Sequence, residues 1–101
     1  MFLHLGGDMV VSTKDIIAIL DMESTLKSKH SRDFLNTCEE EGFIIRATNE
    51  DPRSFVITER VEASKDKRKS IRKIIVYYSP ISAPTLQKRA DFIAAIEQNL
   101  Y

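Results

Sequence analysis

The sequence predicts an α+β domain: a small, mainly antiparallel β-sheet with a mid-chain helix and a C-terminal helix. Two observations lead to this class. The candidate elements follow one another as strands, a helix, strands and a final helix, rather than as alternating βα units. The 101 residues suit one core, and 43% hydrophobic with 30% charged residues is the balance of an ordinary globular protein. We therefore expect a single domain over residues 1–101.

The first two elements are short strands at residues 2–5 and 9–11. They are joined by Gly-Gly-Asp at residues 6–8. These residue types supply the positive φ values that a tight hairpin turn needs. The chain is therefore expected to begin with a β-hairpin.

The segment at residues 12–22 has two interpretations. Its first four residues, Ser-Thr-Lys-Asp, resemble a helix capping box, and apolar residues follow at helical spacing. However, three β-branched isoleucines lie within residues 16–21, and these stiff side chains favour an extended strand. The residues by themselves leave both interpretations open.

A helix is predicted at residues 31–41, where Phe34, Leu35 and Cys38 share one face and Gly42 can end the helix. Two strands are expected next, at residues 43–47 and 54–58. The residues between them include a proline, which cannot donate to a strand ladder, so they form a loop.

The last elements are a strand at residues 74–78 and a helix that Ser82 can cap, with Pro84 tolerated in its first turn. Tyr77 and Tyr78 are adjacent on the strand, so we expect one to enter the core and the other to face solvent or an interface. The helix has its apolar residues at helical spacing, at Leu86, Ala90, Ile93, Ile96 and Leu100.

The formal net charge of +0 hides a separation of charge along the chain. Residues 1–63 carry seven Lys and Arg against twelve Asp and Glu, a net charge of −5. Residues 64–73 carry six Lys and Arg against one Asp, a net charge of +5. The remaining residues carry two of each sign. An acidic body thus carries one short basic segment.

This basic segment lies between two predicted strands, where an arm can reach the phosphates of a nucleic acid. A solvated hairpin tip also collects charge, so the segment alone does not decide between these interpretations. The candidate phosphate contacts are Lys65, Lys67, Arg68, Lys69 and Arg72.

Arg53 is a second candidate. It follows Pro52 in the preceding loop, and its planar guanidinium suits a phosphate or the edge of a guanine. The plainer interpretation is a surface charge beside Glu50 and Asp51.

Catalysis finds little support in the sequence. Neither His4 nor His30 has a nucleophile or an orienting acid at a diagnostic spacing. Cys38, the single cysteine, lies on an apolar helix face and is expected to be a buried, inert thiol. We predict no enzyme, no catalytic residue, no metal site, no cofactor and no small-molecule substrate.

We also predict no membrane association. The longest apolar run, residues 74–78, is far short of the roughly 20 residues of a membrane span. The first residues lack the basic region and long apolar stretch of a signal peptide. A reducing cytoplasm therefore fits best.

Several segments resemble a bacterial family. They are FLHLG at residues 2–6, VVS at 10–12, DIIAILD at 15–21, YYSPIS at 77–82 and the Thr, Leu, Lys, Arg and Ala at 85, 86, 88, 89 and 90. Together they are similar to the extracellular matrix regulatory protein family, in its RemB (YaaB-like) branch, related to the biofilm regulator RemA. The resemblance covers nearly the whole chain.

The resemblance implies a cytoplasmic, DNA-binding transcription regulator of biofilm-matrix genes, with a LytTR-like fold. It implies assembly into rings around whose rim DNA binds, and it favours a strand for residues 16–21. In RemA an adjacent arginine pair in a loop between two strands contacts DNA. Asp51 and Pro52 occupy those positions here, and only the nearby Arg53 can replace the pair.

Two functional hypotheses follow. The first is a homo-oligomeric regulator that binds double-stranded DNA, in which repeated basic segments add weak phosphate contacts along bent DNA. The second is an oligomeric scaffold that binds a protein partner and not DNA. In that case the basic segment meets an acidic surface, for example the −5 body of a neighbouring subunit.

Overall fold

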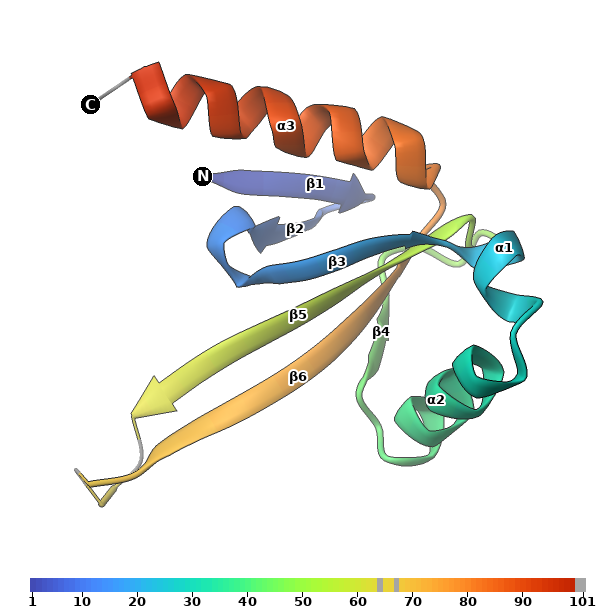
Figure 1. Cartoon of the computed structure of the whole chain (residues 1–101), viewed down its shortest axis with the longest axis horizontal. Coiled ribbons are helices and arrows are strands. Elements are labelled where there is room, and N and C mark those ends of the chain that lie inside the picture. Colours follow the sequence, from blue (N-terminus) through green and yellow to red (C-terminus); the bar gives the residue numbers. More distant parts are fainter. Residues whose placement is uncertain (64, 67, 100–101) are drawn as a thin grey trace.

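The computed structural model describes residues 1–63, 65–66 and 68–99, and Figure 1 shows how their elements are arranged. The elements are β1 (Phe2–Gly6), β2 (Met9–Ser12), a 3₁₀ turn (Thr13–Asp15), β3 (Ile16–Asp21), α1 (Met22–Leu26), α2 (Lys29–Glu40), β4 (Ile44–Arg46), β5 (Ser54–Ala63), β6 (Ser70–Ser79) and α3 (Ala83–Asn99). The α+β class is confirmed. No helix in the described ranges is long and apolar enough to cross a membrane.

The strands form two sheets rather than the one that the element order suggested. β1 and β2 form an antiparallel hairpin, and the other four strands form a sheet in the order β3-β5-β6-β4. In this sheet β4 pairs with β6 in parallel, while β3, β5 and β6 pair antiparallel. The sheet is therefore mixed at one edge and antiparallel elsewhere.

The hairpin turn between β1 and β2 depends on its two glycines. Gly6 has φ +122° and Gly7 has φ +53°, whereas Asp8 keeps a negative φ. The turn therefore forms as predicted, but the aspartate contributes no left-handed conformation. Pro80 packs closely here, because a Cβ on Gly6 would lie 3.0 Å from its Cδ.

The middle of the segment at residues 12–22 is a strand that follows a short 3₁₀ turn. Ser12 ends β2, the other three capping-box residues form the turn Thr13–Asp15, β3 follows at Ile16–Asp21, and Met22 begins α1. A register shift between Ile16 and Ala18 makes Ile17 a bulge residue on this edge strand. The β-branched isoleucines thus decide the conformation, and the helical interpretation is wrong.

The helical region begins earlier than predicted and contains two helices. Asp21 caps α1 by accepting a hydrogen bond from the Ser24 backbone N–H at 2.8 Å, and Ser28 caps α2. The five residues of α1 were missed, because one turn carries no periodic apolar signal. The predicted end holds: Gly42 has φ +75°, and the Phe43 N–H donates to the Cys38 carbonyl at 2.8 Å.

Two buried clusters cover opposite faces of the four-stranded sheet. On one face α1 and α2 cover a cluster of Met22, Leu35, Cys38, Phe55, Val76 and Tyr78. On the other face the β1–β2 hairpin and α3 cover Leu3, Leu5, Val11, Val56 and Leu86. Tyr78 is buried in the first cluster and Tyr77 is half-buried against the second, so the two tyrosines point to opposite faces as predicted. The expectation that one of them faces solvent or an interface is wrong, because the β1–β2 hairpin and α3 give the second face of the sheet a core of its own.

Two buried serines fix the chain between β6 and α3, and one of them also joins the two sheets. The Ser79 hydroxyl donates to the Leu5 carbonyl at 2.6 Å and accepts from the Ile81 N–H at 3.1 Å. Ser54, opposite Ser79 in the β5–β6 ladder, donates to the Ile81 carbonyl at 2.7 Å. Ser82 then caps α3 through the Thr85 N–H, with Pro84 in the first turn. The motif at residues 77–82 therefore has a structural role.

Candidate nucleic-acid interface

The outer halves of β5 and β6 project beyond the rest of the molecule as a two-stranded arm (Figure 1). The last β3 residue paired with β5 lies opposite Thr58, and β4 pairs with β6 only from Val76 onward. Residues 59–63 and 70–74 therefore pair only with each other, and we call them, with the described residues between them, the arm. Both strands are much longer than the predicted 54–58 and 74–78.

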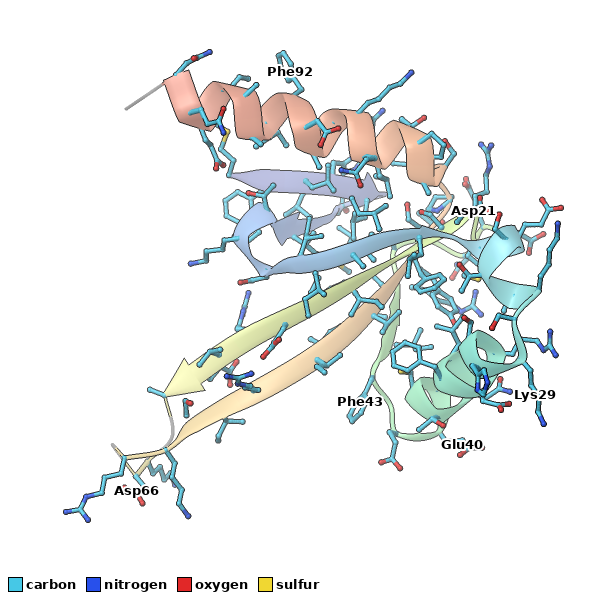
Figure 2. All side chains as sticks on the ribbon, in the orientation of Figure 1. Asp21, Lys29, Glu40, Phe43, Asp66 and Phe92 are labelled. Atoms are coloured by element: carbon cyan, nitrogen blue, oxygen red, sulfur yellow. The ribbon has the colours of Figure 1, made fainter. Side chains whose placement is uncertain are left out.

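The tip of the arm is ordered by Asp66, which Figure 2 labels at its end. The Asp66 backbone carbonyl accepts a hydrogen bond from the Lys69 N–H at 3.0 Å, and its carboxylate accepts one from the Arg68 N–H at 3.1 Å. This turn leaves Lys65, Arg68 and Lys69 exposed to solvent. The structure thus gathers three of the predicted cations at the tip, while Lys67 lies outside the described residues.

The remaining basic residues of the segment lie in β6 rather than in a loop. Arg72 faces the same side of the arm as Glu59, and the two form an ion pair at 3.5 Å. Lys73, which the sequence analysis did not single out, lies on the opposite side because successive strand residues alternate. There it is opposite Arg60, which pairs with Asp15 at 3.6 Å. Glu59 therefore neutralises part of the positive charge of Arg72.

Arg53 does not belong to the same surface as the basic tip. It precedes β5, and the tip follows the other end of this ten-residue strand, so about 30 Å separates them at about 3.4 Å per residue. The Arg53 backbone is held at both ends, because its N–H donates to the Ser79 carbonyl at 2.8 Å and its carbonyl accepts from the Met22 N–H at 3.1 Å. Its side chain is exposed.

Arg53 also has an acidic neighbour. The Ser24 backbone N–H is the main cause of a lowered pKa of Asp21, and the positive charge of Arg53 lowers it further. The Asp21 carboxylate therefore offsets part of the positive charge of Arg53. The candidate interface is the tip of the arm, without Arg53.

The titratable groups of the core are not activated for chemistry. Burial raises the pKa of the Cys38 thiol, so the thiol stays protonated at neutral pH and is a poor nucleophile. Burial is also the main cause of a raised pKa of Tyr78, and the carboxylate of Glu39 raises it further. Arg46 lies over the Tyr78 ring at 5.3 Å and acts in the opposite direction. Within the described residues, no group of three His, Cys, Asp or Glu could hold a metal ion.

The sequence of the chain is similar to those of a known protein family. A family model described as "RemA-like: Extracellular matrix regulatory protein A-like" matches residues 2–90. Extracellular matrix regulatory protein B of Bacillus subtilis (strain 168) is 34% identical over 97 residues. This alignment covers 96% of the present chain and 99% of the relative. The similarity therefore includes the whole fold described above.

Proposed function

The chain belongs to the RemA-like family of extracellular matrix regulatory proteins, in its RemB branch, and on this premise we propose that it is a DNA-binding transcription regulator of extracellular-matrix (biofilm) genes. In this proposal it works in the cytoplasm as a homo-oligomer. Its partner is double-stranded DNA, which it binds through the tips of the arms. The proposal includes no enzymatic activity and no cofactor.

The observation that carries the proposal is the position of the basic tip relative to the acidic body. From Thr58, the last β5 residue paired with β3, to Ala63 the arm extends about 17 Å at about 3.4 Å per residue. The Debye length at physiological ionic strength is about 8 Å, so the negative charge of residues 1–58, six Lys and Arg against ten Asp and Glu, is largely screened at the tip. A phosphate at the tip therefore meets Lys65, Arg68 and Lys69 with little repulsion from the body.

The proposal includes self-association because one arm alone offers few contacts to DNA. Each phosphate contact adds a salt-dependent contribution to the binding free energy, and three tip cations give only weak, non-specific binding. Phosphate contacts position a protein on DNA but carry no direct sequence information. When one assembly carries several arms, the second arm binds at a high effective concentration, and weak contacts add to a useful affinity.

A salt titration of DNA binding with three proteins tests this proposal. The arm variant carries Lys65→Gln, Arg68→Gln and Lys69→Gln, and a matched control removes three exposed cations of the body through Lys14→Gln, Lys27→Gln and Lys29→Gln. Since each lost phosphate contact changes the slope of log K against log salt by about 0.9, we expect the arm variant's slope to be shallower by about 2.7 per arm bound. The control should keep the parent slope. Equal slopes for the parent and the arm variant would refute the proposal.

A second candidate is the oligomeric scaffold that binds a protein partner and not DNA. It is favoured by Asp51 and Pro52, which occupy the positions where the resemblance places the DNA-contacting arginine pair, and by the distance of Arg53 from the tip. Reversing the charges of Lys67, Arg68 and Lys69 separates the candidates. Loss of DNA binding with an intact oligomer supports the regulator, whereas disassembly of the oligomer supports the scaffold.

A further inference from the structure

A shallow groove between β1 and α3 is flanked by two exposed aromatic rings. Phe2 and Phe92 both line it, and each is 67% exposed, more than any other large apolar side chain in the described ranges. Figure 2 shows Phe92 on the side of α3 that points away from the sheets. Leu3 and Ile93 also line the groove and belong to the apolar cluster under the helix, where Leu3 is buried and Ile93 is half-buried. The groove therefore has aromatic sides and an apolar floor.

Two cations line the same groove. Lys88 and Arg89 are exposed, and neither forms an ion pair with any residue that the structure describes. The two carboxylates of α3 are engaged elsewhere, because Asp91 accepts a hydrogen bond from a glutamine side chain at 3.0 Å and Glu97 pairs with the N-terminal ammonium group at 3.2 Å. The positive charge at the groove is therefore available to an anion from outside the described chain.

The two rings and the two cations together have the composition of a binding surface. We call them the basic-aromatic face: Phe2, Phe92, Lys88 and Arg89. Aromatic rings and arginine supply much of the binding energy at protein interfaces, above all where an apolar pocket excludes water. The groove has a volume of about 580 Å³, within the roughly 300–1,000 Å³ of sites that hold an organic ligand. It therefore has room for apolar side chains of a partner.

The chemistry of the face favours an acidic protein segment over a nucleic acid. Either partner would place anions against Lys88 and Arg89. A nucleic acid, however, would bury the polar edges of its bases against Leu3 and Ile93 without hydrogen-bond partners, which is costly. An acidic segment with an aromatic or leucine side chain between its carboxylates supplies both the anions and the apolar group, and a carboxylate matches the planar guanidinium of arginine.

We propose that the basic-aromatic face binds an acidic segment of another protein. The carboxylates of the segment pair with Lys88 and Arg89, and its apolar side chain enters the groove between Phe2 and Phe92. Figure 2 shows Phe92 and Asp66, which marks the tip of the arm, at opposite ends of the molecule. The face is therefore separate from the basic segment that both candidate functions use, and its partner can bind whether or not the arm holds DNA.

Fluorescence anisotropy with labelled model peptides tests this binding. The acidic peptide with apolar side chains is EEEFLEEE; one control peptide, EEEGSEEE, lacks the apolar side chains, and the other, KKKFLKKK, has the opposite charge. We expect the parent protein to bind EEEFLEEE at least about tenfold more tightly than either control peptide. Removing the cations through Lys88→Gln with Arg89→Gln, or the ring through Phe92→Ala, should each weaken this binding by about tenfold or more.

Charge reversal and matched control variants make the test specific to the face. Lys88→Glu with Arg89→Glu should exchange the preference, so that this variant binds KKKFLKKK and loses EEEFLEEE. On the α1–α2 side of the molecule, Lys27→Gln with Lys29→Gln removes two exposed cations, and Phe34→Ala removes a ring that is 43% exposed. Both control variants should keep the parent affinity. Circular dichroism verifies that every variant is folded, as expected for substitutions of exposed side chains.

Several results would overturn the proposal. They are a parent protein that does not prefer EEEFLEEE to EEEGSEEE, folded variants of the face that keep the parent affinity, and control variants that lose it. A changed oligomer mass of Phe92→Ala in light scattering would assign the face to a contact between copies of this chain. If Lys88→Gln with Arg89→Gln instead loses binding to double-stranded DNA or to phosphatidylglycerol vesicles, the face belongs to that partner and not to an acidic protein segment.

Discussion

Replacing Ser79 by alanine should destabilise the joint between the two sheets. The Ser79 hydroxyl is fully buried and makes two hydrogen bonds, to the Leu5 carbonyl at 2.6 Å and from the Ile81 N–H at 3.1 Å. Its loss leaves the carbonyl of the buried Leu5 without this donor, which costs about 1–3 kcal/mol, and removes a second bond worth about 0.5–1.5 kcal/mol. We therefore expect Ser79→Ala to lower the free energy of unfolding by about 1.5–4.5 kcal/mol, and the melting temperature by about 10 °C or more.

Urea unfolding followed by circular dichroism measures this change. All variants must be compared at one protein concentration, because assembly contributes to apparent stability. Ser70→Ala is the matched control: it removes an exposed hydroxyl at the other end of β6 and should change stability by less than about 0.5 kcal/mol. If Ser79→Ala costs no more than Ser70→Ala, the hydroxyl does not join the sheets and our reasoning about this motif is wrong.

Other predictions concern the turns and a helix cap. Gly42→Ala should cost about 1 kcal/mol in urea unfolding, since a Cβ there meets nothing within 4 Å and only the positive φ is penalised. Gly6→Ala should cost clearly more, because the Cβ also meets Pro80 at 3.0 Å; equal costs would contradict the packing described here. The pKa of Asp21 is lowered in the folded state, so its contribution to stability is present above its ordinary pKa and is lost as the pH falls through the lowered one. Asp21→Asn, which keeps an acceptor for Ser24, should therefore flatten the loss of stability below about pH 4; an unchanged acid profile would show that this carboxylate contributes nothing.

Local chemistry made several elements predictable from the sequence. The glycines of the first turn, Gly42 at the end of α2 and Ser82 at the start of α3 each act on residues within a few positions of themselves. Their effects do not depend on the rest of the fold. The conformation of residues 16–21 could not be decided in the same way, because β-branched residues and a capping box pointed to different structures until the pairing with β5 selected the strand.

The lengths of β5 and β6 and the division into two sheets could not be predicted, because both depend on distant pairing. Beyond Thr58 the strand carries charged residues on both sides, so the alternation that marks a half-buried strand ends although the ladder continues to Ala63. The β1–β2 hairpin packs on the larger sheet as a sheet of its own. Its position depends on contacts such as that between Ser79 and Leu5, which are 74 residues apart in the sequence.

The candidate site was predictable in part. The basic segment was visible as local charge, and the structure gathers Lys65, Arg68 and Lys69 at one tip. Local charge could not show that Arg53 lies at the other end of β5, nor that Arg72 is paired with Glu59.

The affinity of the whole protein for double-stranded DNA at 50 mM and 200 mM salt tests DNA binding by the arms most directly. Two arms that each place three tip cations on phosphates make about six contacts. For this number of contacts we expect the affinity to fall by about a thousandfold between the two salt concentrations. A fall of less than about tenfold, or no binding at 50 mM, would contradict DNA binding through the arms.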